Sequence, residues 1–189
     1  MTNTAVKHTT MPRVSVKVQA LAAVIAAAAA VALPQLFHVA GAALGLGAAM
    51  GETFLPMHLP VILVGLLAGP WAGAIAGLLA PLVSYGLTGM PALAMLPFMT
   101  IEVCVYGLSA GLLRNLKFPA VGKVLGVQFA GRLVRAMAIL LAFYVLGSTK
   151  IAPAIIWTSI KAGLPGLILQ WVLIPVILWC VERARSREN

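Results

Sequence analysis

The fold is decided by residues 52–91, which read ETFLPMHLPVILVGLLAGPWAGAIAGLLAPLVSYGLTGMP. Two apolar segments, 56–69 and 72–88, meet at Gly69-Pro70-Trp71, where we expect a tight hinge. The second segment is rich in small residues, namely Gly73, Ala74, Ala76, Gly77 and Ala80. In a bilayer, small residues let helix backbones approach closely where no hydrophobic effect drives helices together. The stretch therefore predicts two closely packed transmembrane helices.

Composition places the whole chain in the membrane class. Of its 189 residues, 62% are hydrophobic and 9% are charged, whereas soluble domains carry about 25% charged residues. The net charge of +9 does not indicate nucleic-acid binding, because the basic residues gather at the chain ends and in one loop, as the positive-inside rule requires. We predict a multi-pass integral membrane protein that binds no nucleic acid.

The apolar runs predict an all-α integral membrane fold with six transmembrane helices in one compact bundle. The expected helices span 14–37, 55–69, 71–88, 91–113, 122–146 and 153–182. Residues 38–54 form either a long loop or a partly helical re-entrant segment, and part of 45–54 can extend the short second helix. Residues 14–183 should form the membrane domain, with cytoplasmic tails at 1–13 and 184–189.

Basic residues orient the bundle. They lie before the first helix, between the fourth and fifth, and after the sixth: Lys7, Arg13, Lys17, Arg114, Lys117, Lys123, Arg183, Arg185 and Arg187. The loops at 38–54 and 88–91 contain no basic residue, and 147–152 contains only Lys150. Six spans with both termini in the cytoplasm satisfy every cluster, whereas five spans would leave the C-terminal arginines outside.

A few ionisable residues lie at membrane depth, where their energetic cost makes each a functional candidate. Glu102 shares a helix face with Tyr106, and Arg132 and Arg135 lie on the next helix. By a rise of about 1.5 Å per residue, Arg135 lies about 18 Å beyond Lys123, too deep for easy snorkelling. Glu102 can pair with either arginine to join the two helices, and that interpretation stays open.

The cations outnumber the buried acid. One carboxylate, Glu102, faces Arg132, Arg135 and Lys161. An anionic ligand can therefore balance the remaining positive charge, unless Glu52 folds in from its loop to do so. Glu52 and His58 are either helix-entry groups or groups that close over a ligand. With Trp157, one turn before Lys161, the predicted substrate-binding residues are Glu52, His58, Glu102, Arg135, Trp157 and Lys161.

The sequence lacks the residues that several kinds of binding and catalytic site require. The chain has no G-x-x-x-x-G-K-[ST] motif, no aspartate, no His-Glu metal spacing and no Ser/His/acid set on plausible faces. Cys104 and Cys180 are interpreted as small buried hydrophobes, and Met90, Met95 and Met99 as packing residues. We expect no catalytic residue, no metal site and no cofactor.

Motifs that follow one another along 56–111 resemble a known family. They are Pro56-x-His58-x-Pro60-Val61, Gly65-x-x-x-Gly69-Pro70-x-x-Gly73, Thr88-Gly-Met-Pro91 and Glu102-x-x-x-Tyr106-Gly107. In this order, and in its size and number of spans, the chain resembles the substrate-binding S components of energy-coupling factor (ECF) vitamin transporters, which are ABC-type transporters.

The resemblance implies a vitamin-binding subunit of a prokaryotic plasma membrane that is not an enzyme. Such a subunit docks on a transmembrane coupling subunit driven by two cytosolic ATPases. The ligand would sit in the outer half of the bundle, under the loops at 38–54, 88–91 and 147–153. Docking in the family uses an Ala-x-x-x-Ala stripe on the first helix, which Ala22, Ala26 and Ala30 match here.

The excess of deep cations favours a carboxylate-bearing vitamin, for which pantothenate and folate are candidates, while cobalamin and pyridine or pyrimidine vitamins stay open. Two other classes compete with the transport subunit. A small membrane enzyme acting on lipid or isoprenoid phosphates would also need interfacial basic residues, but acidic metal ligands are scarce here. A structural subunit of an envelope complex would not need charges inside the membrane.

Overall fold

The computed structural model of the chain describes residues 14–47 and 49–188. All the regular secondary structure in these residues is helical: α1 Val16–Ala43, α2 Ala49–Phe54, α3 His58–Ala68, α4 Pro70–Thr88, α5 Leu96–Leu113, α6 Ala120–Tyr144 and α7 Ile155–Glu188. The expected N-terminal tail, residues 1–13, lies outside the described residues.

The described residues contain six segments that are long and apolar enough to cross a membrane. The second of these, Ala49–Ala68, is formed by α2 and α3 together. The prediction of a six-helix membrane bundle is therefore confirmed. The segment 38–54 is partly helical, because α1 continues to Ala43 and α2 begins at Ala49.

The hinge between α3 and α4 has the predicted form. α3 ends at Ala68 and α4 begins with Pro70. Gly69 between them has a φ of 122°, a backbone conformation that favours glycine. Its N–H donates to the carbonyl oxygens of Val64 and Gly65, which caps α3. Pro70 suits the first position of α4, because its missing N–H would have no partner within the helix.

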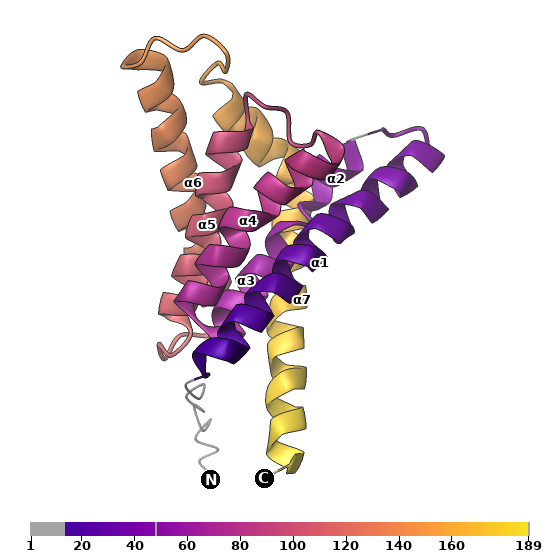
Figure 1. Cartoon of the computed structure of the whole chain (residues 1–189), viewed down its shortest axis with the longest axis vertical. Helices are drawn as coiled ribbons and strands as arrows, with labels where there is room; N and C mark the ends of the chain where they lie inside the picture. Colours follow the sequence, from indigo (N-terminus) through magenta and orange to yellow (C-terminus); the bar gives the residue numbers. More distant parts are fainter. Residues whose placement is uncertain (1–13, 48, 189) are drawn as a thin grey trace, which may run out of the picture.

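Small residues bring α4 and α5 into backbone contact. A Cβ added to Gly73 would meet the carbonyl oxygen of Gly107, and a Cβ added to Gly107 would meet that of Gly73. Gly77 lies in the same way against the backbone of Val103. Figure 1 shows α4 and α5 side by side in the bundle. Close van der Waals packing of this kind holds helices together in lipid.

α1 is longer than predicted. It runs through Pro34 to Ala43 instead of ending near residue 37. Proline removes one helical hydrogen bond, the one to the carbonyl of Ala30. Membrane helices tolerate this loss, because neighbouring groups and local adjustments satisfy the freed carbonyl. The expected end near Pro34 and His38 is therefore wrong, because proline interrupts helices in water more strictly than helices in a membrane.

Two other helix ends also differ from expectation. α5 begins at Leu96 rather than at 91, so residues 91–95 belong to the connection after α4. α7 continues to Glu188 rather than ending near 182, so the basic residues after 182 lie on the same helix. Basic side chains near a helix C-terminus favour such an extension, because they interact well with the helix dipole.

The bundle has two unlike ends (Figure 1). The start of α1, the α5–α6 connection and the end of α7 lie together at one end. We call it the basic end, because it carries Lys17, Arg114, Lys117, Lys123, Arg183, Arg185 and Arg187. The α4–α5 and α6–α7 connections lie at the opposite end, where the helices spread apart. The cytoplasmic position of the basic end stays a prediction of the positive-inside rule.

Candidate functional site

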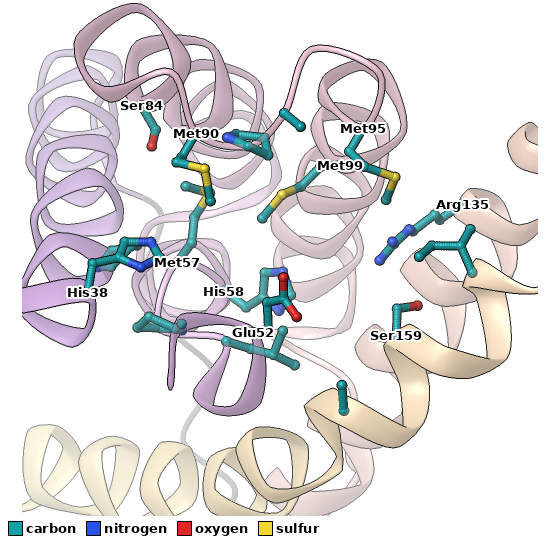
Figure 2. A pocket seen from close by; sticks show the side chains of 18 of the residues that line it. His38, Glu52, Met57, His58, Ser84, Met90, Met95, Met99, Arg135 and Ser159 are labelled. Carbon is teal, nitrogen blue, oxygen red and sulfur yellow. The ribbon is translucent and has the colours of Figure 1, made fainter. Parts of the chain in front are cut away.

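A cavity of about 380 Å³ lies toward the end of the bundle opposite the basic end. It is bounded by the end of α1, by α2, the start of α3, the end of α4, the α4–α5 connection, the start of α5, α6 and the start of α7 (Figure 2). Its polar lining comprises His38, Glu52, His58, Ser84, Arg132, Arg135, Thr158 and Ser159. The volume falls in the range of about 300–1,000 Å³ typical of small-molecule sites.

Two of the three loops that were expected to cover a ligand contribute to this cavity. The segment 38–54 supplies His38, Gly51 and Glu52, and the α4–α5 connection supplies Met90 and Pro91. The segment 147–153 supplies no lining residue, and the first contact from that side is the start of α7.

One wall of the cavity contains a buried cluster of ion pairs. Glu102 on α5 is fully buried. Its Oε2 accepts a hydrogen bond of 2.9 Å from Nη1 of Arg135, and its Oε1 lies 3.1 Å from Nε of Arg132. The hydroxyl of Tyr106 also donates to Oε1, at 2.9 Å. The sequence left open which arginine pairs with Glu102, and the structure pairs it with both.

The two guanidinium groups keep hydrogen-bond donors that are not used within the cluster. Arg132 and Arg135 line the cavity, and each side chain is only 11% exposed. Nη2 of Arg132 and Nε of Arg135 are buried and have no hydrogen-bond partner among the described residues. A buried polar group without a partner costs about 1–3 kcal/mol. The cluster therefore leaves donor groups unsatisfied in two residues that line the cavity.

His58 presents a second set of unpartnered polar atoms. It is 2% exposed and lines the cavity from the first residue of α3. Neither ring nitrogen has a hydrogen-bond partner in the described part of the chain. The ring packs edge-on against Tyr106, with 5.0 Å between centroids. A neutral imidazole offers one donor and one acceptor, so His58 can bind either kind of group.

Glu52 enters the cavity from α2 (Figure 2). This short helix is held against α7 at two glycines. A Cβ on Gly166 would lie 2.6 Å from the backbone at the end of α2, and a Cβ on Gly163 would lie 2.8 Å from the Leu55 side chain. The Gln170 amide also donates to the Leu55 carbonyl at 3.3 Å. α7 thus fixes the segment that carries Glu52.

Trp157 and Lys161 do not line the cavity. The Trp157 side chain is 68% exposed, and Lys161 is also exposed. α7 instead turns Thr158, Ser159 and Ala162 toward the cavity. With about 3.6 residues per turn, Trp157 and Lys161 fall on a neighbouring face of the helix. The helix that carries the two predicted residues does line the cavity, but with another face.

Methionines form a part of the lining that the sequence interpretation missed. Met57, Met90, Met95 and Met99 all line the cavity, whereas the last three were interpreted as packing residues. Their flexible thioether side chains adapt to varied shapes and make favourable contacts with aromatic rings. The spacing held a usable signal, because positions 95, 99 and 102 recur at intervals of four and three residues and so share the helix face of Glu102.

The predicted docking stripe is mostly covered by the chain itself. Ala26 and Ala30 are 7% and 0% exposed, while Ala22 is half-buried. Ala26 and Ala30 belong to a core cluster that includes Ala72 and Ala76 of α4. Small residues indicate that some helix approaches closely, without indicating which one. Here the close neighbours of the stripe lie within the chain, so Ala26 and Ala30 are not free to meet a partner.

Comparison with known proteins identifies the family. The family model described as ECF transporter, substrate-specific component, matches residues 15–178. Searches of curated proteins and of solved structures gave no match. The chain belongs to the family of ECF transporter substrate-specific components, which are multi-pass membrane proteins with small-molecule substrates and membrane-embedded partners. The family is one of transport components rather than enzymes.

Proposed function

We propose that this ECF substrate-specific component binds a carboxylate-bearing vitamin, of the pantothenate or folate kind, with high affinity in the cavity. The ligand carboxylate lies against Arg135 and Arg132, and Glu102 holds both guanidinium groups in place. The observation that carries the proposal is the pair of cavity-lining arginines that share one buried carboxylate.

Charge explains why an anion is favoured at this wall. Two guanidinium groups and one carboxylate leave a local net charge of +1 on the cluster. Translocon scales assign about 2.5–3.5 kcal/mol to an arginine at the centre of a membrane helix. A ligand carboxylate would offset part of this cost through charge-assisted hydrogen bonds, which a planar guanidinium makes in pairs.

The remaining polar lining contacts the rest of the ligand. His58 is buried with both ring nitrogens unpartnered among the described residues, and Glu52 offers a carboxylate from α2. We assign both to substrate binding, together with Arg135 and with Glu102, which acts through the arginines. Trp157 and Lys161 have no part in this assignment, because neither lines the cavity.

The position of the cavity supports uptake from outside the cell. It lies toward the end of the bundle that has few basic residues, and the positive-inside rule places that end outside. The ligand then enters through the external mouth, and the basic end faces the cytoplasm.

Delivery requires the partners that the family implies. We propose a transmembrane coupling subunit driven by two cytosolic ATPases, which other substrate-binding subunits can share. Since Ala26 and Ala30 are buried, we place the contact on the exposed face of α1, which includes Val24, Ala28 and Ala32.

Native mass spectrometry tests the proposal. The chain is purified in mild detergent from cells grown in rich medium, and the bound molecule is released and identified. We expect a vitamin with a carboxylate, and its loss from the Arg135→Gln variant. A bound cobalamin or a vitamin without a carboxylate would contradict the proposed ligand. A bound lipid phosphate or isoprenoid phosphate would favour the rival assignment as a membrane enzyme.

A further inference from the structure

The end of α7 extends past the rest of the bundle. Figure 1 shows its last turns, in yellow, continuing beyond the start of α1 and the α5–α6 connection. A helix of 34 residues is about 51 Å long, whereas the hydrocarbon core of a bilayer is about 30 Å thick. α7 is therefore long enough to reach from the cavity through the hydrocarbon core and into the headgroup layer at the basic end.

One face of this helix end is exposed and changes in character along its length. Val172, Val176 and Trp179 are 63%, 50% and 56% exposed, and Arg183 and Arg187 are exposed beyond them. Spacings of three and four residues place all five on one side of the helix, here called the terminal face. Toward the basic end it passes from aliphatic through aromatic to cationic side chains, which is the order expected between hydrocarbon and headgroups.

The cations of the terminal face differ from two others at the basic end that stabilise helix ends. Arg114 donates from Nη2 to the carbonyl of Leu67 at 3.2 Å, and Lys123 donates from Nζ to the carbonyl of Arg114 at 2.7 Å. These bonds satisfy carbonyl groups at the ends of α3 and α5. Arg183 instead lies over the ring of Trp179, 5.1 Å from its centroid. An arginine held by this cation–π attraction still presents a planar fork of donors that matches a phosphate.

Like charges gather where α7 passes the α5–α6 connection. Burial, and then the nearby charge of Arg185, lower the pKa of the Arg114 guanidinium. The sequence places only Glu182 and Glu188 among the many basic residues of the basic end. Several cations therefore act together on any anion that approaches this surface.

We propose that the terminal face of α7 binds an anionic phospholipid of the leaflet at the basic end. Arg183 and Arg187 contact the headgroup phosphate, Trp179 lies at the interface, and an acyl chain runs along Val176 and Val172. The aliphatic part of the face selects a lipid, because a free phosphate would gain nothing from it. Negatively charged leaflets attract basic residues at their surface, and such anchors fix the depth and tilt of a helix. The site does not depend on which vitamin the cavity binds.

Native mass spectrometry of the full chain in a neutral detergent tests the proposal. Phosphatidylglycerol and phosphatidylcholine with identical acyl chains are titrated separately, and the bound lipid molecules are counted at each concentration. The two probes share the phosphate and the chains, but only phosphatidylglycerol has a net negative charge. We expect phosphatidylglycerol to bind more tightly, because the choline cation offsets the attraction of the arginines for the phosphate.

A matched pair of variants locates the site. Arg183→Gln with Arg187→Gln removes two charges from the terminal face, and Lys150→Gln with Lys161→Gln removes two charges near the start of α7. All four side chains are exposed, so both variants should elute as folded protein. Each basic residue near an anionic surface contributes about fivefold in affinity. We therefore expect the arginine variant to bind phosphatidylglycerol roughly 25-fold more weakly, and the lysine variant to bind it as wild type does.

Glycerol phosphate, a soluble headgroup without acyl chains, supplies the last arm. A preference for phosphatidylglycerol that is lost in the arginine variant, kept in the lysine variant and unaffected by glycerol phosphate supports the proposal. Equal binding of the two lipids, or equal losses in the two variants, would overturn it, because any attraction would then come from the net charge of the chain. Displacement of phosphatidylglycerol by an equal concentration of glycerol phosphate would reveal a site for free phosphate and would also overturn it.

Discussion

Along α4, the two ends of the bundle can be compared within one helix. Toward the basic end, Gly73 and Gly77 press against the backbone of α5, so that even a Cβ would collide. Toward the other end, Gly86 has nothing within 4 Å of the place where its Cβ would lie, and Ser84 lines the cavity. The helices spread apart at this end in Figure 1.

The difference shows how a membrane protein makes a site without a hydrophobic driving force between its helices. Where glycine and alanine repeat, backbones touch and no space is left for a ligand. Where the repeats stop, methionine, histidine, arginine and glutamate line the space that remains. The half of the bundle in which Gly73 and Gly77 pack against α5, here called the closed half, thus stabilises the fold. The opposite half, here called the cavity half, supplies the side chains that can bind a ligand.

The largest effect should come from filling the closed half. Ala26→Trp places a large ring where α1 meets α3 and α4 in the core. Because a close-packed interface cannot absorb such a volume, we expect loss of the folded monomer in size-exclusion chromatography, with binding and transport lost together. Ala28→Trp on the exposed face of α1 should fold and bind normally. If Ala26→Trp bound its vitamin normally and failed only in transport, the stripe would be a docking surface after all.

The next effect tests the ion pairs that join α5 to α6. Glu102→Gln leaves Arg132 and Arg135 without their shared carboxylate. Removing one partner of a buried ion pair typically lowers the free energy of unfolding by about 3–5 kcal/mol. Unfolding in mixed micelles should show this loss, and Glu182→Gln should show almost none. A Glu102→Gln protein as stable as wild type would mean that the ion pairs do not hold α5 to α6.

A smaller effect compares two glycines on one helix. Gly73→Ala forces a Cβ against the backbone of Gly107 and should lower the free energy of unfolding by about 1–3 kcal/mol, the usual range for overpacking. Gly86→Ala meets open space and should raise it by about 0.5–1 kcal/mol, because alanine loses less backbone entropy in a helix. Equal effects at both positions would remove the distinction between the closed half and the cavity half.

Much of the closed half could be predicted from the sequence. The small-residue repeat, the Gly69-Pro70 hinge and the basic clusters depend on local rules, and these gave the six spans and their order. The end of α1 was missed because Pro34 breaks helices in water but is tolerated in this membrane helix.

Less of the cavity could be predicted, because the groups that a side chain meets depend on how its helix is rotated about its own axis. Glu102 and Arg135 were found from their depth, since a buried charge needs a partner wherever its helix turns. Trp157 and Lys161 were predicted to face the ligand, but they lie outside the cavity lining. The local sequence does not indicate which face of α7 meets the cavity. The alanine stripe was assigned to a partner for the same reason.

One paired titration tests the central claim that the cavity binds a carboxylate through Arg135. Folate and pantothenate are titrated into wild type, Arg135→Gln and Lys161→Gln. We expect Arg135→Gln to weaken binding of the preferred vitamin by about 1.5–3 kcal/mol, the range for hydrogen bonds to charged groups, or roughly 10- to 150-fold. Lys161→Gln, which also removes one positive charge from the membrane region, should leave the affinity unchanged. Equal losses in both variants, or no loss in Arg135→Gln, would contradict the account.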